Sequence, residues 1–334
     1  MRTAAKTEAG TERLVTSFDP SAADAARARQ AQLTKPPGSL GRLEELAEFM
    51  AGWQGTASPV IDRAQAIVFA GNHGIVAQGV NPFPAEVTAL MVQNFRNKGA
   101  AINQICALAD ADLSVVEIAL DRPTADFSQS AAMSAEEVTE AMRIGAEAMN
   151  DAAHVLVLGE MGIGNSTVAA VQAAAVFGGS GQDWVGPGTG ADPAIIARKV
   201  AVVDAGLARH NGARTTHETL QAYGGREQAA ICGAILRARE LGIPVLLDGF
   251  ICSAAASVLL RDDPQALDHC LIGHESAEPG HRRLIAAMGK RPVLALDMRL
   301  GEGSGAAIAL MVLRAALACH NGMATFAEAG IGPA

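Results

Sequence analysis

The chain has 334 residues, of which 49% are hydrophobic and 18% are charged. This length predicts one large domain, or one domain with a smaller lobe, and the composition is too apolar for a disordered chain. The 26 Lys and Arg residues against 35 Asp and Glu residues give a net charge of −9, and the basic residues form no run. Nucleic acid and anionic membranes are therefore excluded as expected partners.

The cysteines and the N-terminal segment both indicate a cytoplasmic protein. The five cysteines are scattered, odd in number and without CxxC spacing, which is typical of reduced thiols in a protein core. The N-terminal segment has no apolar stretch of the kind found in signal peptides, and no later run reaches the roughly 18 apolar residues of a membrane span.

Six short apolar runs rich in β-branched residues alternate with helical stretches. They are Ala66–Ala70, Leu113–Ile118, Val155–Leu158, Val245–Leu247, Cys270–Ile272 and Val293–Leu296. This alternation is typical of parallel sheets with helical crossovers. We predict an α/β fold with a Rossmann-like parallel sheet of about six strands flanked by helices.

Four helices are predicted among these strands. Ser134–Met149 begins with a capping box, Ser134 with Glu137 three residues on, and continues with apolar residues at helical spacing. Ala194–Arg209 and Arg226–Leu241 are also expected to be helical. Gly305–Cys319 is strongly apolar but too short to cross a bilayer, so we interpret it as a buried core helix.

The first 60 residues show helical patterning around the turn in Lys35–Met50 (KPPGSLGRLEELAEFM) and no strand signal. We predict that residues 1–60 form a small helical lobe together with the C-terminal tail, residues 320–334. Residues 61–319 are then the large α/β domain that carries the functional site.

In open α/β sheets ligands bind beyond the carboxyl ends of the strands, so the residues after each strand are the informative ones. Gly159–Thr167 (GEMGIGNST) follows the third predicted strand, Asp248 follows the fourth, and Asp297–Gly305 follows the last. One edge of the sheet thus collects glycines, carboxylates and hydroxyls.

Two glycine loops lie among these segments. Gly162–Thr167 runs into an Ala- and Val-rich helix, where backbone N–H groups and hydroxyls can hold a phosphate. A glycine turn capped by Ser166 or Thr167 would explain the same residues equally well. The second loop, Gly186–Gly190, precedes Lys199, whose ammonium either adds charge to the same phosphate or is solvated at the surface.

Gly301–Ala306 (GEGSGA) formally fits the dinucleotide fingerprint GxGxxG/A. We reject this interpretation because no acidic residue follows at about 20 residues and too little chain remains for a nucleotide-binding half. The unusual feature is Glu302, a carboxylate between glycines at a helix start. It is either a general base or an acid that caps the helix.

The sequence contains no convincing metal site and no motif for serine-hydrolase or Walker-type chemistry. We therefore expect neither a metal nor a cofactor.

Several of these segments together resemble the nicotinate-nucleotide–dimethylbenzimidazole phosphoribosyltransferase family. The matching stretches are Lys35–Leu46, Ala70–Met91, Gly159–Thr167, Val245–Phe250, Gly273–Glu278 and Met298–Ala306. They span the chain from about residue 35 to its end, and their combination is far more specific than any one of them.

The resemblance implies roles for individual residues. Glu302 is similar to the family's proton acceptor for the benzimidazole, and Glu160 matches a second active-site acid. The part that holds the phosphate and ribose of the nucleotide corresponds to Gly162, Gly164, Asn165, Gly188, Gly190 and Lys199. We add Ser166 and Asp248 to this group because of their positions after strands. The base pocket corresponds to Phe83, Pro84, Glu86, Met91 and Leu300.

The resemblance also implies the reaction: nicotinate mononucleotide and 5,6-dimethylbenzimidazole give α-ribazole 5′-phosphate and nicotinate, with inversion at the anomeric carbon. It further implies a homodimer in which the helical lobe, with Lys35–Leu40, leans toward the partner's active site. The main alternative is the same transfer to another base. Two less favoured rivals are kept for comparison: an NAD-dependent oxidoreductase that uses Gly301–Ala306, against which the missing downstream acid counts, and a nucleotide-binding sensor without turnover.

Overall fold

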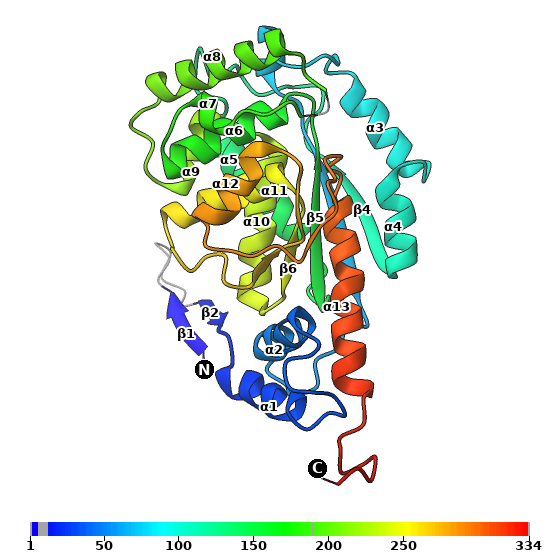
Figure 1. Ribbon diagram of the computed structural model, residues 1–334. Coiled ribbons are helices and arrows are strands. Elements are labelled where there is room, and N and C mark those ends of the chain that lie inside the picture. The colour runs from blue at the N-terminus through cyan, green and yellow to red at the C-terminus, as the bar shows by residue number, and fades with distance from the viewer. Residues whose placement is uncertain (1, 6–12, 189, 333–334) are drawn as a thin grey trace.

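A parallel five-stranded sheet with the order β4-β3-β5-β6-β7 forms the centre of the protein in the computed structural model (Figure 1). Its strands are β3 (Ala64–Ala70), β4 (Ala111–Glu117), β5 (Val155–Met161), β6 (Val245–Leu247) and β7 (Cys270–Ile272). The structure describes residues 2–5, 13–188 and 190–332, with residues 2–5 and 13–16 described by their backbone alone.

The predicted sixth strand lies beside the last of these five. β9 (Leu294–Ala295) pairs in parallel with β8 (His274–Glu275), which follows β7 after the single residue Gly273. The backbone N–H of Val293 also donates to the carbonyl of Ile272 at 2.8 Å. The β8–β9 pair thus continues the edge of the main sheet, and the prediction of a parallel sheet of about six strands is confirmed.

Alternating side chains on the strands supply two separate cores. On β3, Ile67 and Phe69 pack into one core, and Ala66 and Val68 pack into the other. This period of two follows from the pleat, which points successive side chains to opposite faces. Because both faces are covered at the centre of the sheet, β6 and the first four residues of β5 are apolar and buried, as expected for a buried parallel sheet, whereas the edge strand β4 is polar in part.

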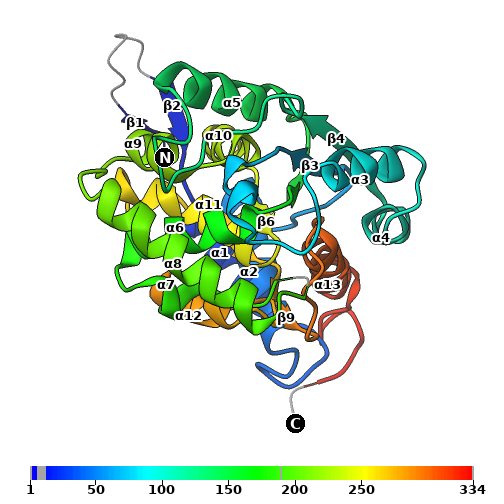
Figure 2. The same ribbon diagram turned by 90° about the horizontal axis from the view of Figure 1, so that it is seen from above.

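Helices cover both faces of the sheet, as the view from above shows (Figure 2). The core that contains Phe69 is completed mainly by α5 (Ala135–Glu147), α10 (Arg226–Leu241) and α11 (Phe250–Ser257). The core that contains Val68 is completed by α2 (Arg42–Gln54), α3 (Val87–Arg96), α4 (Ala101–Ala109) and α13 (Ser304–Gly322). The predicted capping box of α5 is present, since Ser134 and Glu137 bond reciprocally to each other's backbone N–H.

A further set of helices packs outside α11 around a third core. It comprises α6 (Asn165–Phe177), α7 (Gly181–Trp184), α8 (Pro193–Arg209), α9 (Thr216–Tyr223) and α12 (Pro279–Ala287). Two 3-10 turns, η1 (Gly74–Gln78) and η2 (Val258–Arg261), complete the connections. Four of the five cysteines are buried and all five are free thiols.

The strand order places a topological switch point between β3 and β5. From β3 the chain moves outward to β4, and it then returns to the other side of β3 to build β5. In doubly wound folds the crevice at such a point is the usual ligand site. The site is therefore expected above the carboxyl ends of β3 and β5.

The N-terminal segment contains two strands that we did not predict. β1 (Arg2–Ala5) and β2 (Arg13–Thr16) form a two-stranded antiparallel sheet, so the expectation of no strand in the first 60 residues is wrong. Four-residue strands are too short to show a reliable period in the sequence. α1 (Pro20–Gln30) and α2 follow them, as the helical patterning of this region predicts.

α13 is longer than predicted. It runs from Ser304 to Gly322, and by length and composition alone its 19 residues are enough to cross a membrane. The argument that this segment is too short for a bilayer is therefore wrong. Its inner face instead packs on the sheet through Ala309, Leu310 and Leu313, so it is the buried core helix that we expected.

The C-terminal residues contact the N-terminal helices at the far end of α13. Buried His320 accepts a hydrogen bond from Gln30 at 2.9 Å, and the backbone N–H of Phe326 donates to Gln32. In the loop before α2, Lys35 and Glu44 form a largely buried ion pair at 2.7 Å. The division of the chain into a lobe and a large domain stays a prediction.

Candidate active site

The carboxyl ends of β5, β6 and β8 meet the N-terminus of α13 at a cavity of about 380 Å³. The predicted site residues that line it are Phe83, Met91, Glu160, Gly162, Asn165, Ser166, Gly188, Asp248, Leu300 and Glu302. Residues from both halves of the chain therefore meet in one pocket, because most of them follow strands that point the same way.

The other predicted site residues do not line the cavity. Pro84 and Glu86 are exposed immediately before α3. Gly164 is the N-cap of α6, with a φ of +93°, and lies beneath the lining residues. Gly190 lies in the loop before α8, where its N–H donates to the carbonyl of Pro187.

Lys199 is buried directly behind the pocket wall rather than solvated. Its ammonium donates to the hydroxyl of Ser166 at 3.0 Å and to the carbonyl of Gly186 at 3.3 Å. Burial lowers its pKa, while the carboxylate of Glu278 opposes that shift. Lys199 therefore brings a positive charge to the pocket through Ser166.

The loop that carries Glu302 has an unusual backbone. Gly301, Glu302 and Gly303 all have positive φ, at +87°, +65° and +90°. A left-handed conformation is easy for glycine but strained for a glutamate, and such strain concentrates at functional sites. Gly159 on β5 lies so close beneath that an added Cβ would come well inside 3.0 Å of the Glu302 carbonyl oxygen.

Glu302 does not cap α13. The N-cap is Gly303, which has no side chain, so a different carboxylate satisfies the first N–H groups of the helix. Asp248 accepts from the N–H of Gly303 at 3.1 Å and from that of Ala306 at 3.0 Å. The interpretation of Glu302 as a helix-capping acid is therefore excluded by the geometry.

The carboxylate of Glu302 is buried and incompletely bonded. Its Oε2 has no hydrogen-bond partner in the described part of the chain. Burial raises its pKa above the ordinary value, a hydrogen bond from the backbone of Ile102 lowers it, and the negative charge of Asp248 raises it further. A carboxylate with a raised pKa and a free oxygen is suited to accept a proton near neutral pH.

Glu160 lies within β5, because the strand continues to Met161 instead of ending at Leu158 as we predicted. Burial raises its pKa to about 8, helped by the charges of Asp248 and Glu227 and opposed by a hydrogen bond from Asn165. The free protein therefore holds Glu160 largely protonated at neutral pH.

The start of α6 lies at the pocket without a side-chain cap, although the N–H of Asn165 donates to the carbonyl of Gly162 at 3.1 Å and that of Thr167 to the carbonyl of Gly164 at 3.0 Å. Its N-cap, Gly164, has no side-chain capping bond, so neither Ser166 nor Thr167 caps the helix. The first N–H groups of a helix need partners and carry partial positive charge, which favours an anion. Arg299, whose guanidinium donates to the carbonyl of Gly188 at 3.0 Å, adds a second cation to the lining.

Part of the pocket lining is apolar. Phe83, Val87, Met91 and Leu300 line it, and Phe83 and Leu300 are 47% and 50% exposed. Large apolar side chains that are half exposed to solvent on a pocket wall favour binding of an aromatic or aliphatic group of a ligand. The lining therefore offers large apolar side chains as well as cationic groups suited to an anion.

Sequence reasoning missed several lining residues. They are Asn81, Val87, Phe250, His274, Ser276, Glu278 and Arg299, with Met161, Ile163, Gly249, Ile251 and Gly301. Most follow the same strand ends as the predicted residues, so the rule that found Asp248 would also have found His274 and Arg299. Among the described residues, no group of three or more His, Cys, Asp and Glu side chains is arranged to hold a metal ion.

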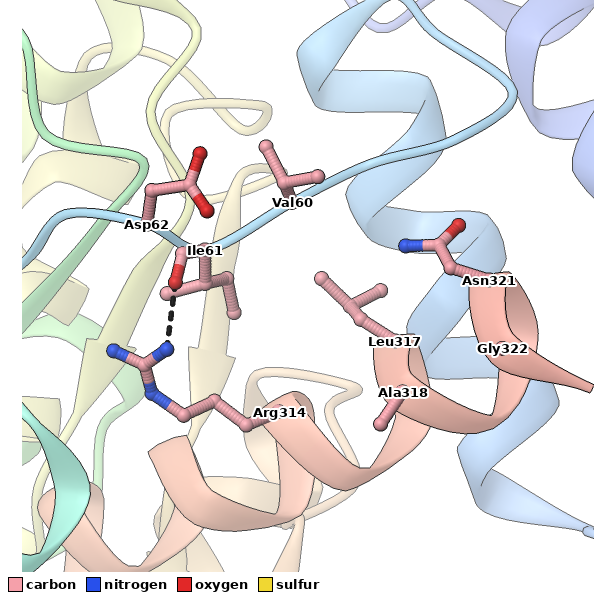
Figure 3. Close-up of a pocket in the computed structure, with 8 residues that line it drawn as sticks. All are labelled: Val60, Ile61, Asp62, Arg314, Leu317, Ala318, Asn321 and Gly322. Carbon is pink, nitrogen blue, oxygen red and sulfur yellow. Dashed lines mark hydrogen bonds between the residues drawn. The ribbon is translucent and has the colours of Figure 1, made fainter.

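A second cavity, of about 390 Å³, lies between the segment before β3 and the last turns of α13 (Figure 3). The cation in its lining, Arg314, donates to the carbonyls of Ile61 and Ala109 at 2.6 and 2.9 Å. Since that guanidinium already binds the protein backbone, this cavity offers no comparable set of functional groups among the described residues.

The family model described as "Phosphoribosyltransferase" matches residues 15–331, and the chain belongs to this family of phosphoribosyltransferases. A doubly wound sheet with an uncapped helix start and a buried carboxylate at the carboxyl edge agrees with that class.

Individual relatives carry a more specific name. Proteins from Rhodobacter capsulatus and Novosphingobium aromaticivorans, both named nicotinate-nucleotide–dimethylbenzimidazole phosphoribosyltransferase, are 60% and 58% identical to this chain. The first match covers 94% of this chain and 93% of the relative, and the second covers 97% and 96%. The crystal structure of the enzyme of that name from Thermus thermophilus is 40% identical. It covers 95% of this chain and 100% of its own, with a TM-score of 0.89.

Proposed function

We propose that this protein transfers the ribose 5-phosphate group of nicotinate mononucleotide to 5,6-dimethylbenzimidazole. The products are α-ribazole 5′-phosphate and nicotinate. Family membership and the shared name of the relatives support this reaction. The observation that carries it in this chain is Glu302, a buried carboxylate with one unpartnered oxygen on the wall of a half-apolar pocket.

The leaving group requires little help. The nicotinate nitrogen in the mononucleotide is a pyridinium, so the electrons of the breaking C–N bond neutralise its charge as nicotinate departs. One benzimidazole nitrogen attacks the anomeric carbon from the opposite face, which converts the β-riboside into an α-riboside. The other nitrogen then loses its proton to the carboxylate of Glu302, which acts as the general base.

Glu160 is the second catalytic residue in this proposal. Positive charge develops on the ribose as the bond to nicotinate breaks, and an ionised carboxylate nearby stabilises it. Its raised pKa keeps Glu160 largely neutral before substrate binds. A pyridinium ring beside the carboxyl favours the ionised form, so the charge arises when the cationic substrate is in place.

Other residues at the pocket bind substrate in this proposal. The N–H groups at the start of α6, with Ser166, Lys199 and the Gly188 loop, hold the 5′-phosphate. Phe83, Met91 and Leu300 contact the aromatic base. Holding both substrates in line for displacement supplies a large part of the rate enhancement. No step of this scheme draws on a redox cofactor.

We further propose a cytoplasmic homodimer. α13 begins at the pocket and ends beside the N-terminal helices, and 19 residues of helix span about 28 Å. Lys35–Leu40, which is part of the proposed lobe of residues 1–60 and 320–334, is thus remote from the pocket of its own chain. In a dimer this segment is placed to close the pocket of the partner. Light scattering on the purified protein tests the dimer.

The test of the reaction is to mix the purified protein with nicotinate mononucleotide and dimethylbenzimidazole, without added metal or NAD, and to follow both products by chromatography and mass. Formation of nicotinate and the α-riboside phosphate in equal amounts supports the proposal. Turnover only with benzimidazole, adenine or a phenol would change the acceptor base. Nucleotide binding without nicotinate release would favour a sensor, and hydride transfer from an added alcohol to NAD would favour an oxidoreductase.

A further inference from the structure

Asp248 is almost completely buried between the end of β6 and the start of α13. Its Oδ2 accepts the N–H of Gly303 at 3.1 Å, and its Oδ1 accepts the N–H of Ala306 at 3.0 Å. The Nε2 of His274 lies 3.3 Å from Oδ1. Both carboxylate oxygens are therefore engaged by the protein, which leaves Asp248 little capacity to bind phosphate or ribose.

The two N–H groups belong to the segment that carries Glu302. Gly303 is the next residue along the chain, and Ala306 lies in the first turn of α13. The backbone of Glu302 is left-handed, a conformation that is strained for a residue with a side chain and persists only where the surroundings impose it. Two residues impose it here. Asp248, which follows β6, binds the N–H groups of Gly303 and Ala306, and Gly159 on β5 lies against the carbonyl of Glu302.

We propose that Asp248 is a positioning residue for the transfer reaction: by binding the N–H groups of Gly303 and Ala306, it fixes Glu302 in the orientation that receives the proton of the base. It acts through Glu302 and does not bind the nucleotide. This inference rests on the proposed function of the same pocket, because its readout is the rate of that reaction.

The charge of Asp248 gives this role a measurable signature. The titratable groups around Glu302 are Asp248, which follows β6, Glu160 on β5 and His274 on β8, with Glu227 on α10 and Arg299 on the preceding loop within the same cluster. The negative charge of Asp248 raises the pKa of both Glu302 and Glu160. Without that charge Glu302 ionises at lower pH, so the acidic limb of the rate profile moves downward.

The experiment compares wild type with Asp248→Asn, in which one oxygen is replaced by an amide nitrogen that cannot accept. We expect kcat to fall at least 10-fold and the acidic limb of kcat to move to lower pH. The KM for nicotinate mononucleotide should change less than threefold. The matched control is Asp19→Asn, because Asp19 also accepts two backbone N–H groups, at the start of α1 and far from the pocket. That variant should behave as wild type.

Three results would overturn the inference. One is an unchanged kcat and acidic limb in folded Asp248→Asn. Another is a KM for the mononucleotide that rises 10-fold or more while kcat is kept, which would make Asp248 a substrate ligand. The third is a lowered kcat without any movement of the limb, as a merely structural defect would give.

A second variant decides the matter if Asp248→Asn does not fold. Asp248→Glu keeps the charge but displaces the oxygens, so kcat should fall while the acidic limb stays where it lies in wild type. Full activity of that variant would contradict the inference. Wild type serves as the reference throughout. If wild type forms no α-riboside phosphate, the proposed function fails; if wild type turns over and the variants do as well, only the role of Asp248 fails.

Discussion

The carbonyl oxygen of Glu302 lies directly against the α-carbon of Gly159, with no room for a methyl group between the two backbones. The glycine on β5 thereby allows the glycine-rich loop before α13 to settle on the sheet edge. The position of Glu302, the proposed general base, therefore depends on residue 159 of β5 being a glycine.

This contact predicts that Gly159→Ala displaces the loop. We expect kcat/KM to fall at least 10-fold, because a shift of about 1 Å at a catalytic group is costly. The free energy of unfolding should fall by about 1–3 kcal/mol, as overpacking a close contact does. Steady-state kinetics and thermal melts provide the measurements. Gly212→Ala is the control, since a Cβ there meets open space; equal kinetics for the two variants would show that the loop tolerates the methyl group.

Glu302→Gln should lower kcat by roughly 10²–10⁴ while the protein stays folded, because the amide cannot accept the proton of the base. Product formation at saturating substrates, with circular dichroism as the folding check, measures this. Glu275→Gln on β8 is the control, since Glu275 pairs with Arg282 outside the pocket. Turnover near that of wild type would mean that the base is elsewhere, and Glu160 would be tested next.

Glu160 should make the stability of the protein depend on pH. Its pKa is near 8 in the folded state and near the ordinary value in the unfolded chain. Between these values the unfolded chain loses the proton and the folded protein keeps it, so stability falls as pH rises from about 4 to 8.

Glu160→Gln removes this ionisation. Relative to wild type, its Tm should be nearly unchanged near pH 4 and higher by about 3 °C or more at pH 8.5, since in a chain of 334 residues a gain of 1 kcal/mol corresponds to roughly 1.4 °C. Differential scanning calorimetry across this range is the measurement. Glu117→Gln, at the exposed end of β4, should follow wild type at every pH. If the Tm of Glu160→Gln changed with pH in parallel with that of wild type, the carboxyl of Glu160 would not be held protonated in the folded protein.

Leu300→Ala should weaken binding of the aromatic base alone. Leu300 is 50% exposed on the apolar wall of the pocket, so a bound ring would cover it. Loss of that contact is worth about 1–2 kcal/mol, or roughly 5- to 30-fold in the KM of the base. The KM of the mononucleotide should not change. Leu296→Ala is the control, because Leu296 is similarly exposed but lies outside the lining. A larger effect on the nucleotide than on the base would place the base elsewhere.

The sheet and much of the site were predictable because their signals are local. The runs that became β6 and β7 have the predicted bounds, and the capping box at Ser134 starts α5 as expected. The positions of Glu160, Asp248 and Glu302 after strands were enough to expect them at one edge. Pro84, Glu86 and Gly190 were assigned to the pocket because they lie in motifs that resemble the family. None of the three lines the pocket.

The role of each carboxylate and its protonation state depended on contacts between residues that are distant in the sequence. The sequence alone determined the parallel α/β sheet, the edge at which ligands bind and the family resemblance, because apolar periodicity and motif spacing are properties of neighbouring residues. Only the tertiary structure decided that Asp248, and not Glu302, caps α13, and that burial among other carboxylates keeps Glu160 protonated. Desolvation and hydrogen-bond partners are set by what packs around a residue, and that packing exists only in the folded chain.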